Sequence, residues 1–257
     1  MEFRVLGGHQ VDSAEGRPTS FLIDGCVALD AGGLTAALGI DEQLGIEHVV
    51  ITHQHYDHIR DLGFLGLRLL QAGRQVEVHC SPVVHDLLRQ TLLNPAIWLD
   101  FFAVPSPSRP TFLYRPVTSG EPFTAGACQF MPIDHHRHTV PVVAYEVTGA
   151  NGKRLLYTGD TGPGIRDIWP RVHPDVLVTE VTYPNAEAEA ARYGHLTPDL
   201  VEAELRAFRD AKGYLPRILI CHVNQQNQAP VADELAAMAR RLRASVECTS
   251  EGLRLVL

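Results

Sequence analysis

Four side chains that can bind metal ions lie within six consecutive positions: His53, His55, Asp57 and His58. In an extended segment, residues two apart point the same way, so His53 and His55 can converge on one ion. Asp57 and His58 follow where the chain must turn, and they can face a second point close by. Imidazole and carboxylate ligands suit Zn²⁺, Mn²⁺ or Fe²⁺, and pairs of such ions serve hydrolysis in phosphatases and nucleases. This spacing favours a dinuclear metal site over a histidine-rich surface loop.

The element that carries this cluster is a short apolar strand, and its pattern recurs along the chain. The β-branched run 49–51 leads into His53. Three later apolar runs also lead into polar residues, namely Asp160, Glu180 and His222. Unbroken apolar runs are typical of strands buried on both faces, and α/β sheets bind ligands beyond their strand ends. We therefore expect these residues to share one crevice.

The remaining pattern predicts a single domain over residues 1–257, built from two β-rich halves that meet near residue 120. Further strands are expected at 3–6, 19–24, 26–30, 76–79, 112–117, 127–133, 140–147, 153–158 and 253–257. Apolar residues at helical spacing predict helices at 62–70, 83–93, 198–208 and 230–242. No linker or low-complexity tract interrupts this order.

Composition limits the class of protein. The net charge is −8, which weighs against binding of a long nucleic acid. No apolar run approaches 18 residues, so we expect no membrane-spanning helix. The five cysteines are scattered and odd in number, which favours free thiols in a reducing compartment. The first residues do not resemble a secretion signal. We therefore expect a cytoplasmic protein.

Two further features have alternative readings. Asp30 ends a predicted strand. It is either a turn or helix-cap residue, or a hydrogen-bond acceptor that orients a ligand histidine. Residues 94–110 contain four prolines and no clear period. Their aromatic residues Trp98, Phe101 and Phe102 could form a lid that stacks on a substrate ring. A subunit contact or a small satellite core is the alternative.

The stretch His53-Gln54-His55-Tyr56-Asp57-His58 matches the His-x-His-x-Asp-His signature of the metallo-β-lactamase superfamily. His138, Asp160 and His222 follow in the order of that family's later ligands, so the chain resembles the family over essentially its whole length. The resemblance implies an α/β fold, a four-layer αββα sandwich of two mixed β-sheets flanked by helices. It also implies a dinuclear site in the groove between the sheets.

The resemblance further implies two ligand sets. One ion would take His53, His55 and His138, the other would take Asp57, His58 and His222, and Asp160 would bridge them. His135 and His136 are alternatives to His138. The pair Ala144-Tyr145, six and seven residues after His138, favours His138 because it resembles a small residue plus Tyr in the ribonuclease Z-like branch, where Gly is usual instead of Ala. We expect two divalent ions, Zn²⁺ first and Mn²⁺ or Fe²⁺ as alternatives.

A second motif is similar to the phosphodiesterase branch of the family, which contains ribonuclease Z and the class II cyclic-nucleotide phosphodiesterases. It consists of Glu180 and the later Gly194-His195-Leu196-Thr197-Pro198. The resemblance implies that Glu180 orients His195, which would donate a proton to the leaving oxygen or stabilise charge on the phosphoryl group. The alternative is that His195 is only a loop residue before a helix.

Together these features predict a metal-dependent phosphodiesterase with Asp57, Glu180 and His195 in catalytic roles. A hydroxide held at the dinuclear site would hydrolyse a small phosphodiester, with a 3′,5′-cyclic nucleotide such as cyclic AMP as the expected substrate. A ribonuclease Z-like nuclease that processes RNA 3′ ends is the nearest alternative, and the acidic charge argues against it. A thioesterase or glyoxalase II-like hydrolase would not require Glu180 and His195. A binding module without catalysis is the remaining alternative. By resemblance, we expect a homodimer.

Overall fold

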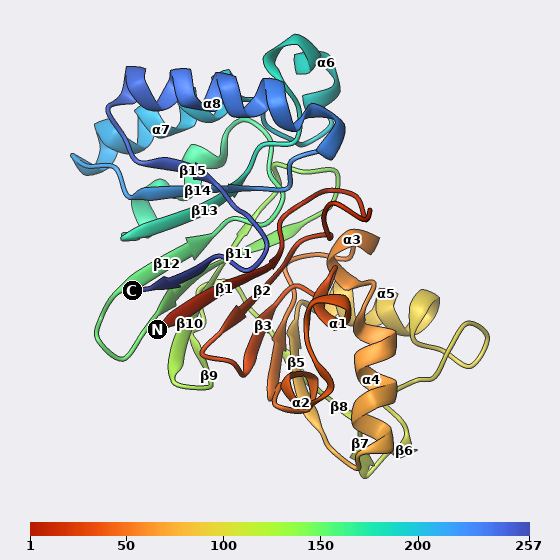
Figure 1. Ribbon diagram of the computed structural model, residues 1–257. Coiled ribbons are helices and arrows are strands. Elements are labelled where there is room, and N and C mark those ends of the chain that lie inside the picture. Colours follow the sequence, from red (N-terminus) through yellow and green to blue (C-terminus); the bar gives the residue numbers. More distant parts are fainter.

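Two seven-stranded mixed β-sheets pack face to face in the computed structural model, which describes residues 1–257 (Figure 1). The first sheet has the order β16-β1-β2-β3-β4-β5-β8. Its strands are β1 (Glu2–Gly7), β2 (Ser20–Ile23), β3 (Val27–Leu29), β4 (His48–Val50), β5 (Val76–Cys80), β8 (Phe112–Pro116) and β16 (Arg254–Val256). Strand β16 comes from the end of the chain, so the first sheet joins both ends of the sequence.

The second sheet has the order β15-β14-β13-β12-β11-β10-β9. Its strands are β9 (Phe123–Ala125), β10 (Cys128–His135), β11 (Val142–Thr148), β12 (Arg154–Tyr157), β13 (Val176–Glu180), β14 (Arg217–Cys221) and β15 (Val246–Cys248). The strands pair antiparallel from β9 to β12 and parallel from β12 to β15. In the first sheet β3, β4, β5 and β8 are likewise parallel. Each sheet therefore presents one edge where the carboxyl ends of parallel strands meet.

Helices cover the outer faces of both sheets and complete a four-layer arrangement (Figure 1). The first sheet carries α1 (Leu34–Ala37), α2 (Ile40–Leu44), α3 (Tyr56–Ile59), α4 (Leu62–Gln71), α5 (Pro82–Leu87) and the π-turn η1 (Leu88–Leu92). The second carries η2 (Ile165–Arg171), η3 (Asn185–Glu187), α6 (Ala188–Ala191), α7 (Pro198–Lys212), η4 (Gln225–Asn227) and α8 (Gln228–Leu242). None of these helices combines the length and apolarity that crossing a bilayer requires. The predicted αββα sandwich is confirmed.

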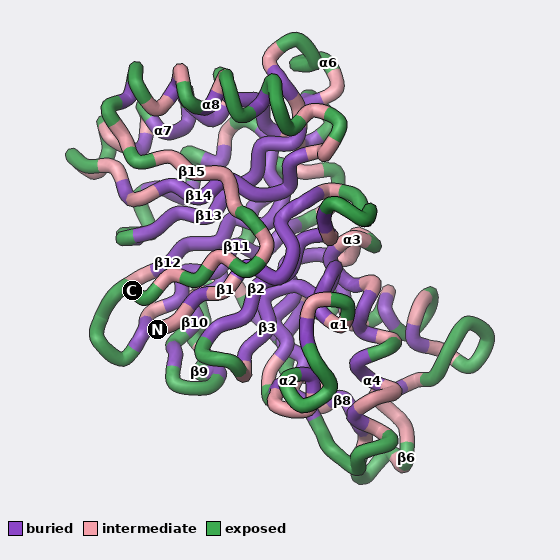
Figure 2. Tube along the Cα trace, viewed as in Figure 1, coloured by how far each residue is buried: buried purple, intermediate pink, exposed green.

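Three apolar clusters hold the layers together, and the buried residues run through the centre of the molecule (Figure 2). The middle cluster lies between the sheets and includes Phe21 and Val50 from the first sheet with Phe130 and Tyr145 from the second. The outer clusters lie beneath the helices of each half. Burial of this apolar surface is the main favourable term in folding, at roughly 25 cal/mol per Å².

Several short elements escaped prediction. Strands β9 and β15 contain only three residues each, too few for an alternating pattern to stand out. A helix is present where 83–93 was predicted, but it is α-helical only as far as Leu87 and continues as the π-turn η1 from Leu88. Residues 94–110 contain a two-stranded hairpin, β6 (Pro105–Ser106) with β7 (Arg109–Pro110).

Candidate active site

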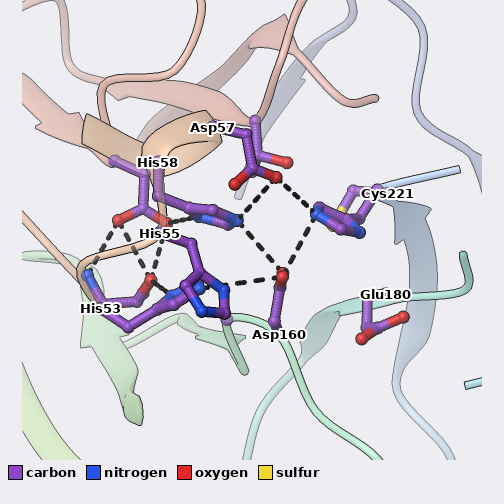
Figure 3. A network of polar contacts seen from close by, with 12 residues as sticks. His53, His55, Asp57, His58, Asp160, Glu180 and Cys221 are labelled. Carbon is purple, nitrogen blue, oxygen red and sulfur yellow. Dashed lines mark hydrogen bonds and ion pairs between the residues drawn. The ribbon is translucent and has the colours of Figure 1, made fainter. Parts of the chain in front are cut away.

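The candidate site lies where the carboxyl ends of parallel strands from both sheets meet. His53 and His55 lie in the loop after β4, and Asp57 and His58 lie in the short helix α3. From the second sheet come Asp160 after β12, Glu180 at the end of β13, and His222 after β14. Figure 3 shows Asp160 pointing between the labelled histidines and Asp57. His138 comes from the β10–β11 loop, and His195 from the loop before α7.

The first group of ligand atoms belongs to His53, His55, His138 and Asp160, and all lie within 4.8 Å of one another. His138 Nε2 is 2.9 Å from His55 Nδ1, and His53 Nε2 is 3.8 Å from Asp160 Oδ2. His135, one of the alternatives to His138, instead faces the Thr158 carbonyl through Nε2 at 2.9 Å. The structure thus brings His138 to this group and turns His135 away from it.

The second group consists of Asp57, His58, His222 and, again, Asp160. His222 Nε2 lies 3.0 Å from Asp57 Oδ2 and 3.2 Å from Asp160 Oδ2. His58 Nε2 lies 3.3 Å from Asp160 Oδ1. Asp160 is therefore the one carboxylate that belongs to both groups.

Two buried nitrogens indicate that this donor set fits metal ions. His53 Nε2 and His58 Nε2 are buried and have no hydrogen-bond partner. A buried polar atom without a partner costs about 1–3 kcal/mol, so such atoms are rare in folded proteins. A divalent cation in each group would satisfy one of these nitrogens. Imidazole nitrogens with carboxylate oxygens form a donor set for Zn²⁺, Mn²⁺ or Fe²⁺.

In four of the five ligand histidines the protein also holds the other ring nitrogen, which fixes the ring. His58 Nδ1 lies 2.7 Å from Asp30 Oδ2, and His222 Nδ1 lies 2.8 Å from Thr182 Oγ1. His138 Nδ1 lies 2.7 Å from the Gly194 carbonyl, and His53 Nδ1 lies 3.0 Å from Thr52 Oγ1. Such partners set the tautomer of these four rings and leave Nε2 facing the ligand groups, whereas His55 faces its group through Nδ1.

Asp30 is the most connected of these partners, and it is fully buried. Besides His58, its carboxylate accepts hydrogen bonds from Thr52 N–H at 2.8 Å and from the Tyr157 hydroxyl at 2.8 Å. Asp30 adopts a left-handed backbone with φ 54°, which turns the carboxylate away from the strand path. These contacts agree with the interpretation of Asp30 as an acceptor that orients a ligand histidine.

Two glycines allow the close approaches on which the site depends. Gly159 has φ +62°, and a Cβ there would lie 2.7 Å from Val142 Cγ1. This turn places Asp160 at the centre of the site. Gly194 has φ +100°, and a Cβ would lie 2.6 Å from His138 Cα. Only glycine therefore lets the 194 carbonyl reach the His138 ring.

The local charge favours a cation. Burial lowers the pKa of His58, but the carboxylates of Asp160, Asp30 and Asp57 outweigh it and raise this pKa well above its usual value. Burial raises the pKa of Asp160, but His222 and His58 outweigh it and hold this pKa well below the usual range. The surrounding carboxylates thus favour positive charge inside the site, and a bound divalent ion would supply it.

Glu180 and His195 form a connected pair beside both groups. Glu180 is fully buried, and its Oε1 lies 2.7 Å from His195 Nδ1. Its Oε2 accepts hydrogen bonds from the Thr182 hydroxyl at 2.8 Å and from Leu196 N–H at 3.2 Å. Burial lowers the pKa of His195, but the Glu180 carboxylate outweighs it and raises this pKa to about 9. The pair therefore favours a protonated imidazole.

Cys221, which Figure 3 shows near the site, does not provide a nucleophile. Burial raises the pKa of its thiol well above the usual value, so the sulfur stays protonated. Its Sγ faces the Thr179 carbonyl at 3.5 Å. Cys221 is a small core residue at the end of β14.

The prediction of a stacking surface from Trp98, Phe101 and Phe102 is wrong for Phe101, whose side chain is fully buried. Phe101 packs against Phe112 in the outer core and occupies the space left by Gly66. Phe102 also packs on this core and is partly buried. Trp98 is 38% exposed and lines a pocket of ≈ 140 Å³ together with Tyr56 of the histidine motif. Trp98 is thus the most exposed of the three.

Sequence reasoning missed Thr182, Tyr157 and a neighbouring pocket. Thr182 lies two residues after Glu180 and links Glu180 Oε2 to His222 Nδ1 through its hydroxyl. Its position two residues from a candidate acid was the available signal, because such residues face the same way in extended chain. The pocket measures ≈ 360 Å³ beside His138, and its lining includes Arg137 and Arg192. Its walls come from three loops that lie far apart in the sequence, so no local motif predicts the pocket.

Comparison with known proteins gives the family. A family model described as "Beta-lactamase superfamily domain" matches residues 19–223, most of the chain. The chain belongs to the metallo-β-lactamase superfamily. All of the ligand candidates described above lie within the matched range.

One curated protein and two solved structures illustrate what this chain is similar to. A Yersinia pestis protein named "Probable 3',5'-cyclic-nucleotide phosphodiesterase" is 24% identical over 187 residues, which are 65% of this chain and 52% of the relative. The match thus spans about half of that relative's length. Unliganded yeast PDE1 superposes with a TM-score of 0.86 at 16% identity, over 100% of this chain and 99% of that one. The short form of human tRNase Z (ELAC1) superposes with a TM-score of 0.67 at 18% identity, over 100% and 99%. The structural matches establish the shared fold.

Proposed function

We propose that this metallohydrolase-family protein hydrolyses 3′,5′-cyclic nucleotides with two divalent cations. The observation that carries the proposal is the buried Glu180–His195 pair, which lies against two His/Asp groups that share Asp160. One ion would be held by His53, His55 and His138, the other by Asp57, His58 and His222. Two ions in such a site supply an activated water and stabilise charge on the transferring phosphoryl group.

The chain's own contribution to the reaction is a positioned proton donor. Glu180 holds His195 Nδ1, so Nε2 is the nitrogen left to act on a substrate. The His195 ring packs against His222 at 5.3 Å and His138 at 4.9 Å between ring centroids, one histidine from each ligand group. His195 Nε2–H would therefore donate its proton to the leaving oxygen, and such general-acid catalysis is worth about 10²–10⁴-fold in rate.

The surroundings suit a small anionic substrate. The pocket beside His138 has a volume of ≈ 360 Å³, within the usual range of roughly 300–1,000 Å³ for small-molecule sites. Arg137 and Arg192 line it, so guanidinium groups are present beside His138 for an anionic substrate. Arg137 is paired with Asp167, and Arg192 with Glu189; both pairs are exposed, so a phosphate could replace either carboxylate as the partner.

The named relatives support this assignment without fixing it. The Yersinia pestis relative carries a cyclic-nucleotide phosphodiesterase name, and yeast PDE1 shares the whole fold. Human tRNase Z also shares the fold, so RNA 3′ processing is the second candidate. The net charge of −8 weighs against it, because binding of a long RNA draws most of its affinity from basic residues.

A substrate panel tests the proposal. The metal-replete protein is assayed on 3′,5′-cyclic AMP, 3′,5′-cyclic GMP, bis(p-nitrophenyl) phosphate and a 3′-extended precursor tRNA, with His195→Ala as the control variant. We expect rapid turnover of a cyclic nucleotide that the variant loses. Activity on bis(p-nitrophenyl) phosphate alone would support phosphodiester hydrolysis but reject cyclic nucleotides as the substrate. Cleavage of the tRNA would favour the ribonuclease Z-like alternative.

A further inference from the structure

A second group of metal-type side chains lies away from the candidate active site, on strands β4 and β5. His48 is the first residue of β4, whereas His53 and His55 follow the last residue of that strand. His48 is the register partner of Glu77 on β5, and His79 lies two residues after Glu77. Register partners and residues two apart face the same side of a sheet. The three side chains therefore converge at the opposite end of β4 from the dinuclear site.

Their three donor atoms form a nearly equilateral triangle. His48 Nδ1 lies 3.2 Å from His79 Nε2 and 3.3 Å from Glu77 Oε2, and His79 Nε2 lies 3.4 Å from Glu77 Oε2. Tetrahedral zinc with ligands at about 2.0–2.1 Å requires ligand atoms about 3.3–3.4 Å apart. We propose that His48, Glu77 and His79 bind a single Zn²⁺-type ion, with its fourth position open to water.

The protein holds two of the three donors in place before any ion binds. Arg115 Nε donates to Glu77 Oε1 at 2.9 Å, so the other oxygen, Oε2, is the one turned to the histidines. The His79 ring stacks on Phe123 of the second sheet, with ring centroids 4.6 Å apart and planes 10° apart. The side chains of His48, Glu77 and His79 are 16%, 27% and 5% exposed, so the triangle is sheltered yet reachable from solvent.

The donor set selects the class of ion. Two imidazoles with one carboxylate suit Zn²⁺, Co²⁺ or Ni²⁺, whereas Mg²⁺ and Ca²⁺ prefer oxygen ligands. An ion here would cross-link neighbouring strands β4 and β5 directly. It would thereby hold in place the strand whose other end leads into His53 and His55.

Counting bound zinc in matched variants tests this site. Full-length protein is dialysed against Zn²⁺ and its metal content measured by mass spectrometry, beside Glu77→Gln, His79→Gln and the exposed-histidine control His173→Gln. We expect the wild type and the control to bind one more ion per chain than Glu77→Gln or His79→Gln. Because the readout is a difference, it does not depend on how many ions the dinuclear site takes up. Arg115→Gln should weaken this ion's affinity by about 10-fold or more.

A diffraction measurement covers the case in which a variant fails to fold. Crystals of the wild-type protein grown with Zn²⁺ should give an anomalous peak at the zinc edge inside the His48–Glu77–His79 triangle. Equal zinc content in the wild type and Glu77→Gln, or no anomalous peak in the triangle, would overturn the proposal. The three side chains would then form only a hydrogen-bonded cluster.

Discussion

Glu180 holds His195 through a 2.7 Å contact between a fully buried carboxylate and an imidazole that packs against one histidine of each ligand group. This relationship distinguishes the site from a metal centre alone, because it adds a protonated group aimed at the same space. Glu180 accepts four contacts in total, from Thr161, Thr182, His195 and Leu196. A carboxylate so fully bonded positions the imidazole rigidly.

The first prediction concerns this pair. His195→Ala should lower kcat for a cyclic nucleotide by about 10²–10⁴-fold, the usual size of a general-acid contribution. Both ions should remain bound, because His195 belongs to neither proposed ligand set. Metal content and steady-state kinetics measure the two effects. Full activity in the variant would remove His195 from the reaction, and loss of metal would make it a ligand instead.

A second prediction separates the charge of Glu180 from its shape. Glu180→Gln keeps an acceptor for Thr182 but removes the charge that favours protonated His195. We expect the variant to retain metal and to lose kcat by about 10-fold or more. Glu187→Gln, an exposed carboxamide change on η3, is the matched control. Equal rates in both variants would contradict a role for Glu180 in holding the proton donor.

The third prediction concerns the bridge. Asp160→Ala should reduce bound metal by at least one ion and abolish turnover, because Asp160 is shared by both ligand groups. The exposed Asp233→Ala on α8 should leave metal content and rate unchanged. If Asp160→Ala kept two ions and measurable turnover, the shared-carboxylate arrangement would be wrong.

The fourth prediction is a pH dependence of stability that arises at His135. Burial lowers the pKa of this histidine to about 4, and its neutral imidazole faces the Thr158 carbonyl. The unfolded chain binds the proton with an ordinary pKa of about 6.5. The folded state is therefore favoured above pH ~6.5 and loses this contribution as pH falls toward ~4, by up to about 1.4 kcal/mol per pH unit.

His135→Gln should lack that part of the pH dependence. Urea unfolding at pH 7.5, 6 and 5 measures the free energy of unfolding for both proteins at fixed metal concentration. The difference between wild type and variant should shrink as the pH falls. A difference that stays constant across this range would show that His135 does not remain neutral in the folded protein.

The fifth prediction concerns Trp98. If its exposed indole stacks on the base, Trp98→Ala should raise KM for cyclic AMP by about 5-fold or more, since stacking is worth roughly 1–3 kcal/mol per base. The turnover number should change little. Val83→Ala, another exposed apolar residue, serves as the control. An unchanged KM would place Trp98 outside the substrate site.

The sequence allowed the fold and most of the candidate site to be anticipated where the signal is local. His53, His55, Asp57 and His58 lie within one loop and helix turn, so their spacing alone predicts convergence. His138 could be chosen over His135 and His136 only by resemblance, because the choice depends on which ring turns toward His55. The burial of Phe101 could not be predicted, because an aromatic residue in an irregular segment has the same sequence pattern whether it faces a substrate or the core. The role of Thr182 and the pocket lined by Arg137 and Arg192 depend on tertiary contacts, which residue spacing in the sequence does not predict.

The most direct test of the central claim is hydrolysis of 3′,5′-cyclic AMP by the metal-replete protein equilibrated in ¹⁸O-labelled water. Mass spectrometry of the product from a single turnover reports where the new phosphate oxygen comes from. The account predicts rapid formation of a nucleoside monophosphate that carries one ¹⁸O in its phosphate. The absence of turnover, or a first product without the label, would contradict water-based hydrolysis of a cyclic nucleotide at this site.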